Sequence, residues 1–225
     1  MDIRYRHEWK HEISYVDLLS IRQRLRAVAE SDPHAVNGKY FIRSLYFDNA
    51  DDKALREKLD GVNRREKFRI RYYNGDSSLI HLEKKSKVSG LGTKYSATLT
   101  AEEAQSIVDG SWDWMLTSER PLVQELYCKM QYQGMRPKTI VDYIREPFIY
   151  RPGNVRVTFD YNIRTGLRCT DFLNRDCLTV PAPDAGIILE VKWDDFLPSV
   201  IRDAVQTPGR RVTAFSKYAQ CRMYD

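Results

Sequence analysis

The sequence has 225 residues, of which 42% are hydrophobic and 30% are charged, and its formal net charge is +5. A chain of this size can bury a sizeable core, and it contains no apolar run of about 18 residues that would span a membrane. The charged segment before Lys10 lacks the apolar centre of a secretory signal, and the basic excess is modest for a nucleic-acid binder. We therefore expect a cytoplasmic globular protein without a membrane segment. Its partners should be anions other than nucleic acids.

The four cysteines are scattered along the sequence, at Cys128, Cys169, Cys177 and Cys221. They form no Cys-x-x-Cys pair and no tight cluster with histidine, so a zinc site is not expected. Reduced thiols fit a cytoplasmic protein.

Period-two alternation of charged and apolar residues predicts the first elements in chain order. The segment from Arg4 to Ile13 places Arg, Glu and Lys on one face and Tyr, His and Trp on the other, as a strand does. Ser14 then precedes a helical spacing of apolar residues that should end near residues 31–33. A strand over residues 40–48 and a short helix over 51–59 follow.

Turn chemistry predicts two hairpins in the middle of the chain. Asn74-Gly75-Asp76 joins strands at 64–73 and 79–87, and the turn at 151–154 joins strands at 139–149 and 154–162. The remaining predicted strands cover residues 94–99 and 186–193. The remaining predicted helices begin at Ala101, Pro121, Leu197 and near Ala214. No helix or strand is assigned to residues 166–184. Without a linker, we expect a single domain over residues 1–225 of the α+β class.

The polar faces of the predicted strands are rich in cations. If these faces converge inside a closed antiparallel sheet, the positive charges repel one another unless an anion binds. Arginine and lysine suit the oxygens of a tri- or polyphosphate. The plain alternative is that each face is simply solvated. The faces include Arg6, Glu8 and Lys10; Ser44, Tyr46 and Asp48, opposite Leu45 and Phe47; Lys67, Arg69 and Arg71; His81, Glu83, Lys85 and Lys87; Tyr143 and Arg145; Arg156 and Asp160; and Glu190 and Lys192.

Four carboxylates on these faces are candidate metal ligands: chiefly Glu190, with Glu8, Glu83 and Asp160. Carboxylate oxygens bind Mg²⁺ or Mn²⁺, which bridges phosphate oxygens in phosphoryl-transfer enzymes. For Glu83 and Glu190 the alternative is an ion pair with a neighbouring lysine.

Five short segments then support a resemblance: Ser44–Asp48, Phe68–Tyr72, Leu82–Lys85, Leu189–Lys192 and Phe215–Tyr218. In this order they resemble the VTC domain, the polyphosphate polymerase branch of the triphosphate tunnel metalloenzyme (CYTH-like) superfamily. The resemblance implies an antiparallel β-barrel tunnel with flanking helices. It also implies metal-dependent transfer of the γ-phosphoryl group of ATP to a growing polyphosphate chain.

The expected site follows from the faces and from this resemblance. Arg69, Arg71, Lys85, Arg145 and Glu190 are the predicted catalytic residues, with Glu190 as the main ligand of Mn²⁺ or Mg²⁺. The predicted phosphate-binding residues are Lys10, Lys87, Lys94, Tyr143, Arg156, Ser216 and Lys217. The expected partners are ATP and inorganic polyphosphate; any membrane-protein partner is unknown.

Two other functions remain open at this stage. A tunnel triphosphatase would use the same residues to direct water onto a triphosphate. Hydrolases of the superfamily usually carry Glu-x-Glu-x-Lys near the N-terminus, whereas Arg6-His7-Glu8-Trp9-Lys10 has a single Glu, which favours holding a long polyanion. A non-catalytic polyphosphate-binding module is the second alternative.

Overall fold

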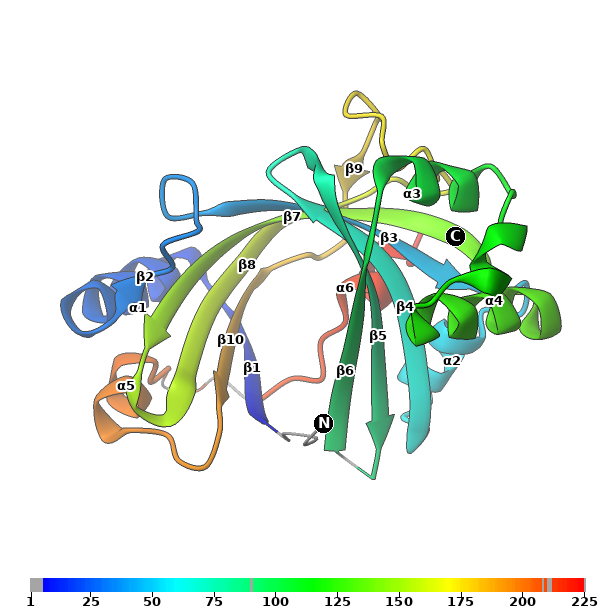
Figure 1. Ribbon diagram of the computed structural model, residues 1–225. Coiled ribbons are helices and arrows are strands. Elements are labelled where there is room, and N and C mark those ends of the chain that lie inside the picture. The colour runs from blue at the N-terminus through cyan, green and yellow to red at the C-terminus, as the bar shows by residue number, and fades with distance from the viewer. Residues whose placement is uncertain (1–5, 90, 208, 210–211, 225) are drawn as a thin grey trace. The chain divides into compact units, whose positions relative to one another are not determined.

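The computed structural model describes residues 6–89, 91–207, 209 and 212–224 (Figure 1). The chain forms two compact units. Unit 1 comprises residues 1–41, 143–163 and 184–215, and unit 2 comprises residues 42–142, 164–183 and 216–225. Both combine paired β-strands with helices, so the predicted α+β class with antiparallel pairing and flanking helices is confirmed. The single-domain organisation stays a prediction.

Unit 1 is built on the strand order β1–β10–β8–β7. β1 (His7–Ile13) pairs antiparallel with β10 (Ile187–Trp193), and β10 pairs antiparallel with β8 (Val155–Thr165). The second half of β7 (Arg136–Tyr150) also pairs with the short strand β2 (Glu30–Ser31). A turn of 3-10 helix, η2 (Pro152–Asn154), joins β7 to β8.

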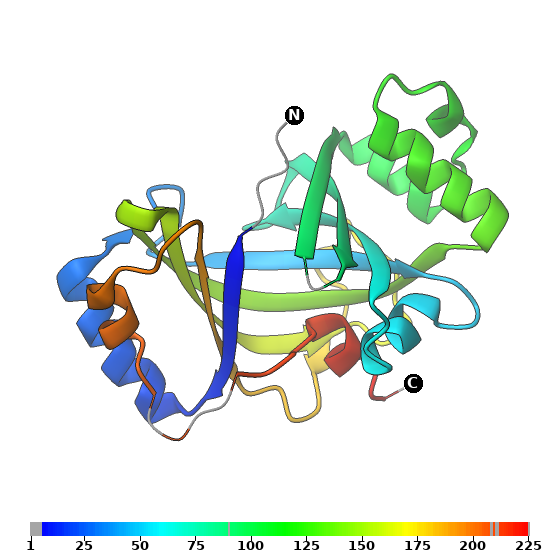
Figure 2. The same cartoon turned by 90° about the horizontal axis from the view of Figure 1, so that it is seen from below.

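Two helices cover the apolar face of the unit 1 strands (Figure 1 and Figure 2). They are α1 (Tyr15–Val28), which starts at a capping box formed by Ser14 and Asp17, and α5 (Ser199–Ala204). Alternation explains this packing, because every second residue of β8 and β10 points to the helices. The resulting core contains Leu18, Ile21, Leu25, Val157, Phe159, Leu189, Val191 and Ile201.

The strand order of unit 2 is the first half of β7, β3 (Tyr40–Asp48), β4 (Arg64–Tyr73), β5 (Asp76–Val88) and β6 (Leu91–Leu99). The predicted turn at Asn74-Gly75 is confirmed: both residues have positive φ, of 54° and 71°, as a tight hairpin turn requires. The remaining elements are α2 (Lys53–Leu59), α3 (Ala101–Val108), η1 (Asp113–Thr117), α4 (Pro121–Gln133), β9 (Val180–Pro181) and α6 (Lys217–Cys221).

The core of unit 2 lies between α3, η1 and α4 and one face of the β3–β6 strands. Leu45 and Phe47 from β3, Phe68 and Ile70 from β4, and Leu82 from β5 are fully buried there. These are the apolar positions of the predicted alternation. Their sequence neighbours, among them Arg69, Arg71 and Glu83, therefore project from the opposite face.

Several predicted boundaries were wrong for identifiable reasons. α1 ends at Val28 and not near residue 31, because Glu30 and Ser31 pair with β7. The last helix begins at Lys217 and not near Ala214, because Ser216 is its N-cap and accepts a hydrogen bond from the Ala219 amide. The start of the first predicted strand, Arg4 and Tyr5, lies outside the described residues.

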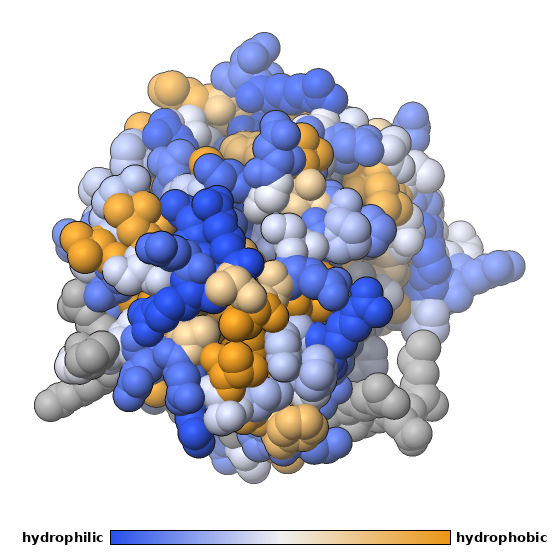
Figure 3. All heavy atoms as spheres, turned by 90° about the vertical axis from the view of Figure 1, so that its left-hand side faces the viewer, coloured by the Kyte–Doolittle hydropathy of each residue, from blue (hydrophilic) through white to orange (hydrophobic). Residues whose placement is uncertain are grey.

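The surface of α1 carries exposed apolar side chains, including Tyr15, Val16 and Leu19. The face shown in Figure 3 has apolar patches separated by hydrophilic residues. Such interspersed exposed apolar residues are ordinary for a folded protein surface. In the described part of the chain, every helix is too short or too polar to cross a lipid bilayer.

Candidate functional site

The polar face of unit 2 is organised by the register of three neighbouring strands. Tyr46 of β3 lies opposite Arg69 of β4, and Arg69 lies opposite Glu83 of β5. The Arg69 guanidinium donates to the Tyr46 hydroxyl at 2.8 Å and to Glu83 Oε2 at 2.7 Å from Nε and 2.6 Å from Nη2. All three side chains are buried. Cross-strand pairing therefore fixes the position of the arginine from both sides.

Glu83 is held between two cations. Lys94 of β6 lies 2.5 Å from Glu83 Oε1, on the side away from Arg69. Burial by itself raises the pKa of the Glu83 carboxyl, but Arg69, Arg71 and Lys94 more than offset it, and the net pKa lies well below its ordinary value. The carboxylate is therefore ionised at neutral pH, and both of its oxygens are in ion pairs.

The same face continues along β4 and β5 with more cations than carboxylates. Arg71 donates to the Ser44 hydroxyl at 2.9 Å and is buried. Lys67 lies opposite Lys85 in the β4–β5 register, and Lys85 lies opposite Lys94 in the β5–β6 register. Lys87, one alternation further along β5, is exposed. The predicted residues Arg69, Arg71, Lys85 and Lys94 thus share one face of unit 2, with Lys87 at its margin.

Tyr46 is the residue of this face that sequence reasoning missed as a site residue. Its ring stacks on Tyr218 of α6, with ring centroids 5.0 Å apart, and lies below the Lys67 ammonium at 5.7 Å. Burial raises the pKa of the Tyr46 phenol, but the positive charges of Arg69, Lys67 and Arg71 more than offset this effect. The net pKa is lowered to about 7. The signal in the sequence was its place on the polar face of β3. Its arginine partner, however, is set by a pairing between distant segments.

We expect the Tyr46 ionisation to be visible in a titration of absorbance near 295 nm. One tyrosine should ionise near pH 7, far below an ordinary tyrosine near pH 10. Since the folded pKa is depressed, the stabilisation from the phenolate is complete only above pH 10 and is lost as the pH falls through about 7. The step should vanish in Tyr46→Phe and persist in Tyr132→Phe, whose side chain is exposed. A wild-type protein with no step below pH 9 would contradict this assignment.

The polar face of unit 1 has a cluster of its own around Glu190 of β10. Lys10 of β1 lies opposite Glu190, and Glu8 lies opposite Lys192. Lys192 forms an ion pair with Glu190 and lies 3.7 Å from Glu8, and the Lys10 ammonium lies 3.0 Å from Glu8 Oε1. Burial raises the Glu190 pKa, but Lys192, Lys10 and Arg145 more than offset it, so the net pKa is well below its ordinary value.

Arg145 of β7 connects this cluster to Asp160 of β8. Its guanidinium makes two parallel contacts of 2.7 Å with the Asp160 carboxylate and lies 3.8 Å from Glu190 Oε2. The Tyr143 ring lies 5.6 Å from the guanidinium carbon. Burial lowers the pKa of Arg145, but Asp160 and then Tyr143 more than offset it, so the guanidinium stays charged. The predicted residues Lys10, Glu8, Glu190, Arg145, Tyr143 and Asp160 are thus brought together in unit 1.

Three further predicted phosphate-binding residues are Arg156, which lies opposite Lys192 in the β10–β8 register, Ser216 and Lys217. Arg156 of β8 forms an ion pair with Asp32 at 3.0 Å, and its side chain is 40% exposed. Ser216 serves as the N-cap of α6, and Lys217 is the first residue of that helix. Their predicted roles in phosphate binding stay predictions.

The four predicted metal ligands all form ion pairs with neighbouring cations. Asp160 is fully engaged by Arg145, and Glu83, in unit 2, by Arg69 and Lys94. Within the ranges that the structure describes, no group of three His, Cys, Asp or Glu side chains is placed to hold a metal ion. Mg²⁺ is often bound by one or two carboxylates together with substrate phosphates. Glu8 and Glu190 share Lys192, and Glu190 also faces Arg145 at 3.8 Å, so their role as metal ligands stays a prediction.

Comparison with solved structures finds distant likenesses. A protein from Pyrococcus horikoshii OT3 is 14% identical, with 89% of this chain and 84% of that chain covered and a TM-score of 0.44. A candidate adenylate cyclase from Bacillus halodurans is 13% identical, with coverages of 91% and 87% and a TM-score of 0.48. A candidate adenylate cyclase from Vibrio parahaemolyticus is 8% identical, with coverages of 90% and 83% and a TM-score of 0.46.

The comparison of sequences identifies the family. None of the curated proteins compared with this sequence matches it. The family model of the VTC domain, however, matches residues 5–224, nearly the whole chain, and this confirms the resemblance seen in the five short segments. The chain therefore belongs to the VTC domain family.

Proposed function

We propose that this protein is a metal-dependent polyphosphate polymerase, which transfers the γ-phosphoryl group of ATP to the end of an inorganic polyphosphate chain. Membership of the VTC domain family supports the class of substrate. The observation that carries the proposal is the excess of cations on the polar face of unit 2. There Lys67, Arg69, Arg71, Lys85 and Lys94 share one face with the Glu83 carboxylate.

Such a face needs an anion to balance it. Cations in a partly desolvated place repel one another, and a phosphate chain offers a negative oxygen at every repeat. The arginines are suited to grip it because Tyr46 and Ser44 already hold their guanidinium groups in fixed positions. A guanidinium group whose position is fixed before binding loses less conformational entropy when it binds the anion.

The transfer itself needs positioning and charge neutralisation more than acid–base catalysis. A terminal oxygen of the acceptor chain attacks the γ-phosphorus in line, the bond from that phosphorus to the β–γ bridging oxygen breaks, and ADP leaves with the electron pair. In unit 2, Arg69, Arg71 and Lys85 would stabilise phosphate oxygens that gain charge, and Arg145 is the corresponding group of unit 1. A bound Mn²⁺ or Mg²⁺ would add further neutralisation, with Glu190 and Glu8 as the residues that would hold it.

Products of an ATP reaction test the proposal directly. Purified protein is incubated with ATP and Mn²⁺, and the products are separated on a gel stained for polyphosphate and assayed for orthophosphate. Polymerisation should give a ladder of chains and one ADP for each phosphate incorporated. Orthophosphate without a ladder would instead identify a tunnel triphosphatase. Intact ATP together with retained polyphosphate binding would identify a binding module.

A further inference from the structure

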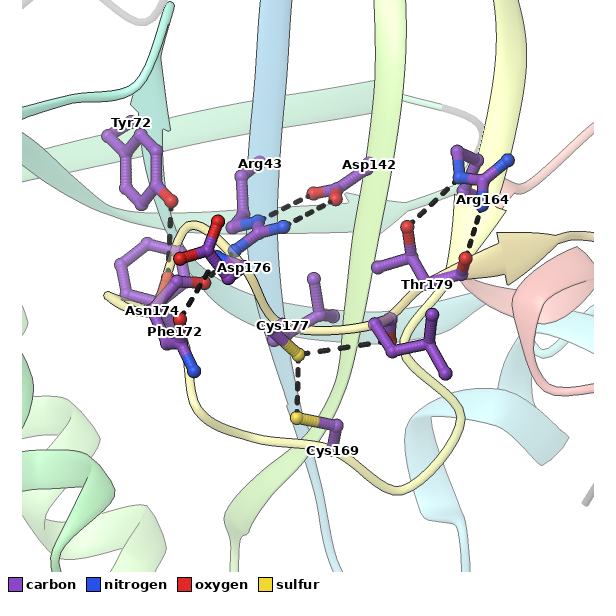
Figure 4. A network of polar contacts seen from close by, with 12 residues as sticks. Arg43, Tyr72, Asp142, Arg164, Cys169, Phe172, Asn174, Asp176, Cys177 and Thr179 are labelled. Atoms are coloured by element: carbon purple, nitrogen blue, oxygen red, sulfur yellow. Dashed lines mark hydrogen bonds and ion pairs between the residues drawn. The ribbon is translucent and has the colours of Figure 1, made fainter.

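Residues 166–183 of unit 2, for which the sequence predicted no helix or strand, form a long segment that contacts β3 and β4 (Figure 4). We call this segment the strap. Phe172 is fully buried and its ring centroid lies 4.9 Å from that of Tyr72, whose hydroxyl donates to the Phe172 carbonyl at 3.2 Å. Arg43 of β3 donates to the Asn174 carbonyl at 2.5 Å. The strap is thus anchored through Phe172 and Asn174.

Two cysteines flank these anchors. Cys169 and Cys177, eight positions apart in the sequence, have their sulfur atoms 2.7 Å apart (Figure 4). Both are free thiols, and both are half-buried. A disulfide places its sulfur atoms about 2.05 Å apart, so a small side-chain rotation brings this pair to bonding distance.

The surroundings disfavour ionisation of Cys177. Burial, followed by the hydrogen bond with Cys169, raises the pKa of the Cys177 thiol to about 12, against the opposing charge of Arg43. The thiolate is the nucleophile in thiol–disulfide exchange, so the pair reacts through the sulfur that loses its proton first.

We propose that Cys169 and Cys177 form a dithiol site that a small-molecule disulfide, such as oxidised glutathione, converts into an intramolecular disulfide bond. One cysteine of the pair, as its thiolate, attacks one sulfur of the reagent, forms a mixed disulfide and releases one reagent thiolate. The other cysteine then gives its proton to solvent and attacks the protein sulfur of the mixed disulfide, which releases the second reagent thiolate. The protein loses two electrons and two protons, and the reagent disulfide is reduced to two thiols.

The bond would close the stretch from Cys169 to Cys177, which contains both anchor residues. Closing a loop restricts the unfolded chain and so favours the folded state, as long as the native geometry accepts the bond. Oxidation should therefore hold the strap on the sheet and raise the melting temperature by several degrees. The inference does not depend on the proposed polymerase activity.

Mass spectrometry of the full chain tests the site. The chain carries Arg168 and Arg175, and the next basic residue after Arg175 is Lys192, so trypsin separates the two cysteines into peptides 169–175 and 176–192. After treatment with oxidised glutathione these peptides should appear as a linked pair that dithiothreitol separates. Four thiols still open to alkylation, or a link from either cysteine to Cys128 or Cys221, would overturn the proposal.

Variants separate this bond from general thiol oxidation. Cys128→Ser removes an exposed thiol and should leave the linked pair and the rise in melting temperature intact. Cys169→Ser and Cys177→Ser should each lose both, and each variant should retain a glutathione adduct on the remaining cysteine of the pair. A linked pair with no rise in melting temperature would contradict the role assigned to the bond in holding the strap.

Discussion

Replacing Glu190 by glutamine should slow phosphoryl transfer from ATP at least about 100-fold, the usual cost of losing a charge-stabilising group. Glu190 is 4% exposed and faces the cations of Lys10, Lys192 and Arg145. Glutamine keeps the shape of the side chain but removes the negative charge that would hold the metal ion. The rate is measured as ADP released and as polyphosphate formed.

Binding of tripolyphosphate without metal separates this effect from a loss of folding. Because the variant gains one unit of net positive charge beside Lys10 and Lys192, calorimetry should show affinity unchanged or tighter. Glu30→Gln is the matched control in unit 1, since the Glu30 carboxylate forms an exposed ion pair with Arg151 at 3.4 Å, and it should keep full activity. Wild-type turnover in Glu190→Gln would rule out the role given to this carboxylate.

The alternation in the sequence was enough to predict which face each strand residue occupies. Leu45 and Phe47 are in the unit 2 core as expected, whereas Ser44 and Tyr46 are on the polar face. This succeeds because the side-chain period of a strand is local and needs no knowledge of the neighbouring strand. The class, the hairpin at Asn74-Gly75 and the start of α4 at Pro121 follow from the same kind of local signal.

Pairings between distant segments could not be predicted in this way. Asp48 was placed on the charged face, but its carboxylate accepts from the amides of Ala54 and Leu55 at 2.9 and 3.1 Å, and from the Tyr218 hydroxyl at 2.7 Å. It therefore anchors α2 and α6 structurally. The contact between Cys169 and Cys177 was also missed, because only the fold of the strap brings them together.

Asp142 is a residue that the sequence did not single out, and its removal should have the largest effect on stability. It forms a double contact with Arg43, with Nε–Oδ1 of 2.9 Å and Nη2–Oδ2 of 2.8 Å, and the two side chains are 3% and 4% exposed. Asp142→Ala leaves the guanidinium buried with the Asn174 carbonyl as a partner but without a counter-charge. Breaking one side of a buried ion pair costs about 3–5 kcal/mol.

Urea unfolding of three variants distinguishes the cost of an unpaired charge from the value of the pair. Asp142→Ala should lower the free energy of unfolding by about 3–5 kcal/mol and the melting temperature by roughly 10 °C. Arg43→Met combined with Asp142→Leu should lose much less, because neither charge is then buried alone. Glu30→Ala, which breaks the exposed pair with Arg151, should stay within about 1 kcal/mol of wild type. If Asp142→Ala lowers the free energy of unfolding no more than Glu30→Ala does, the strap does not depend on this ion pair. Arg43 would then keep its hydrogen bond to the Asn174 carbonyl without a counter-charge.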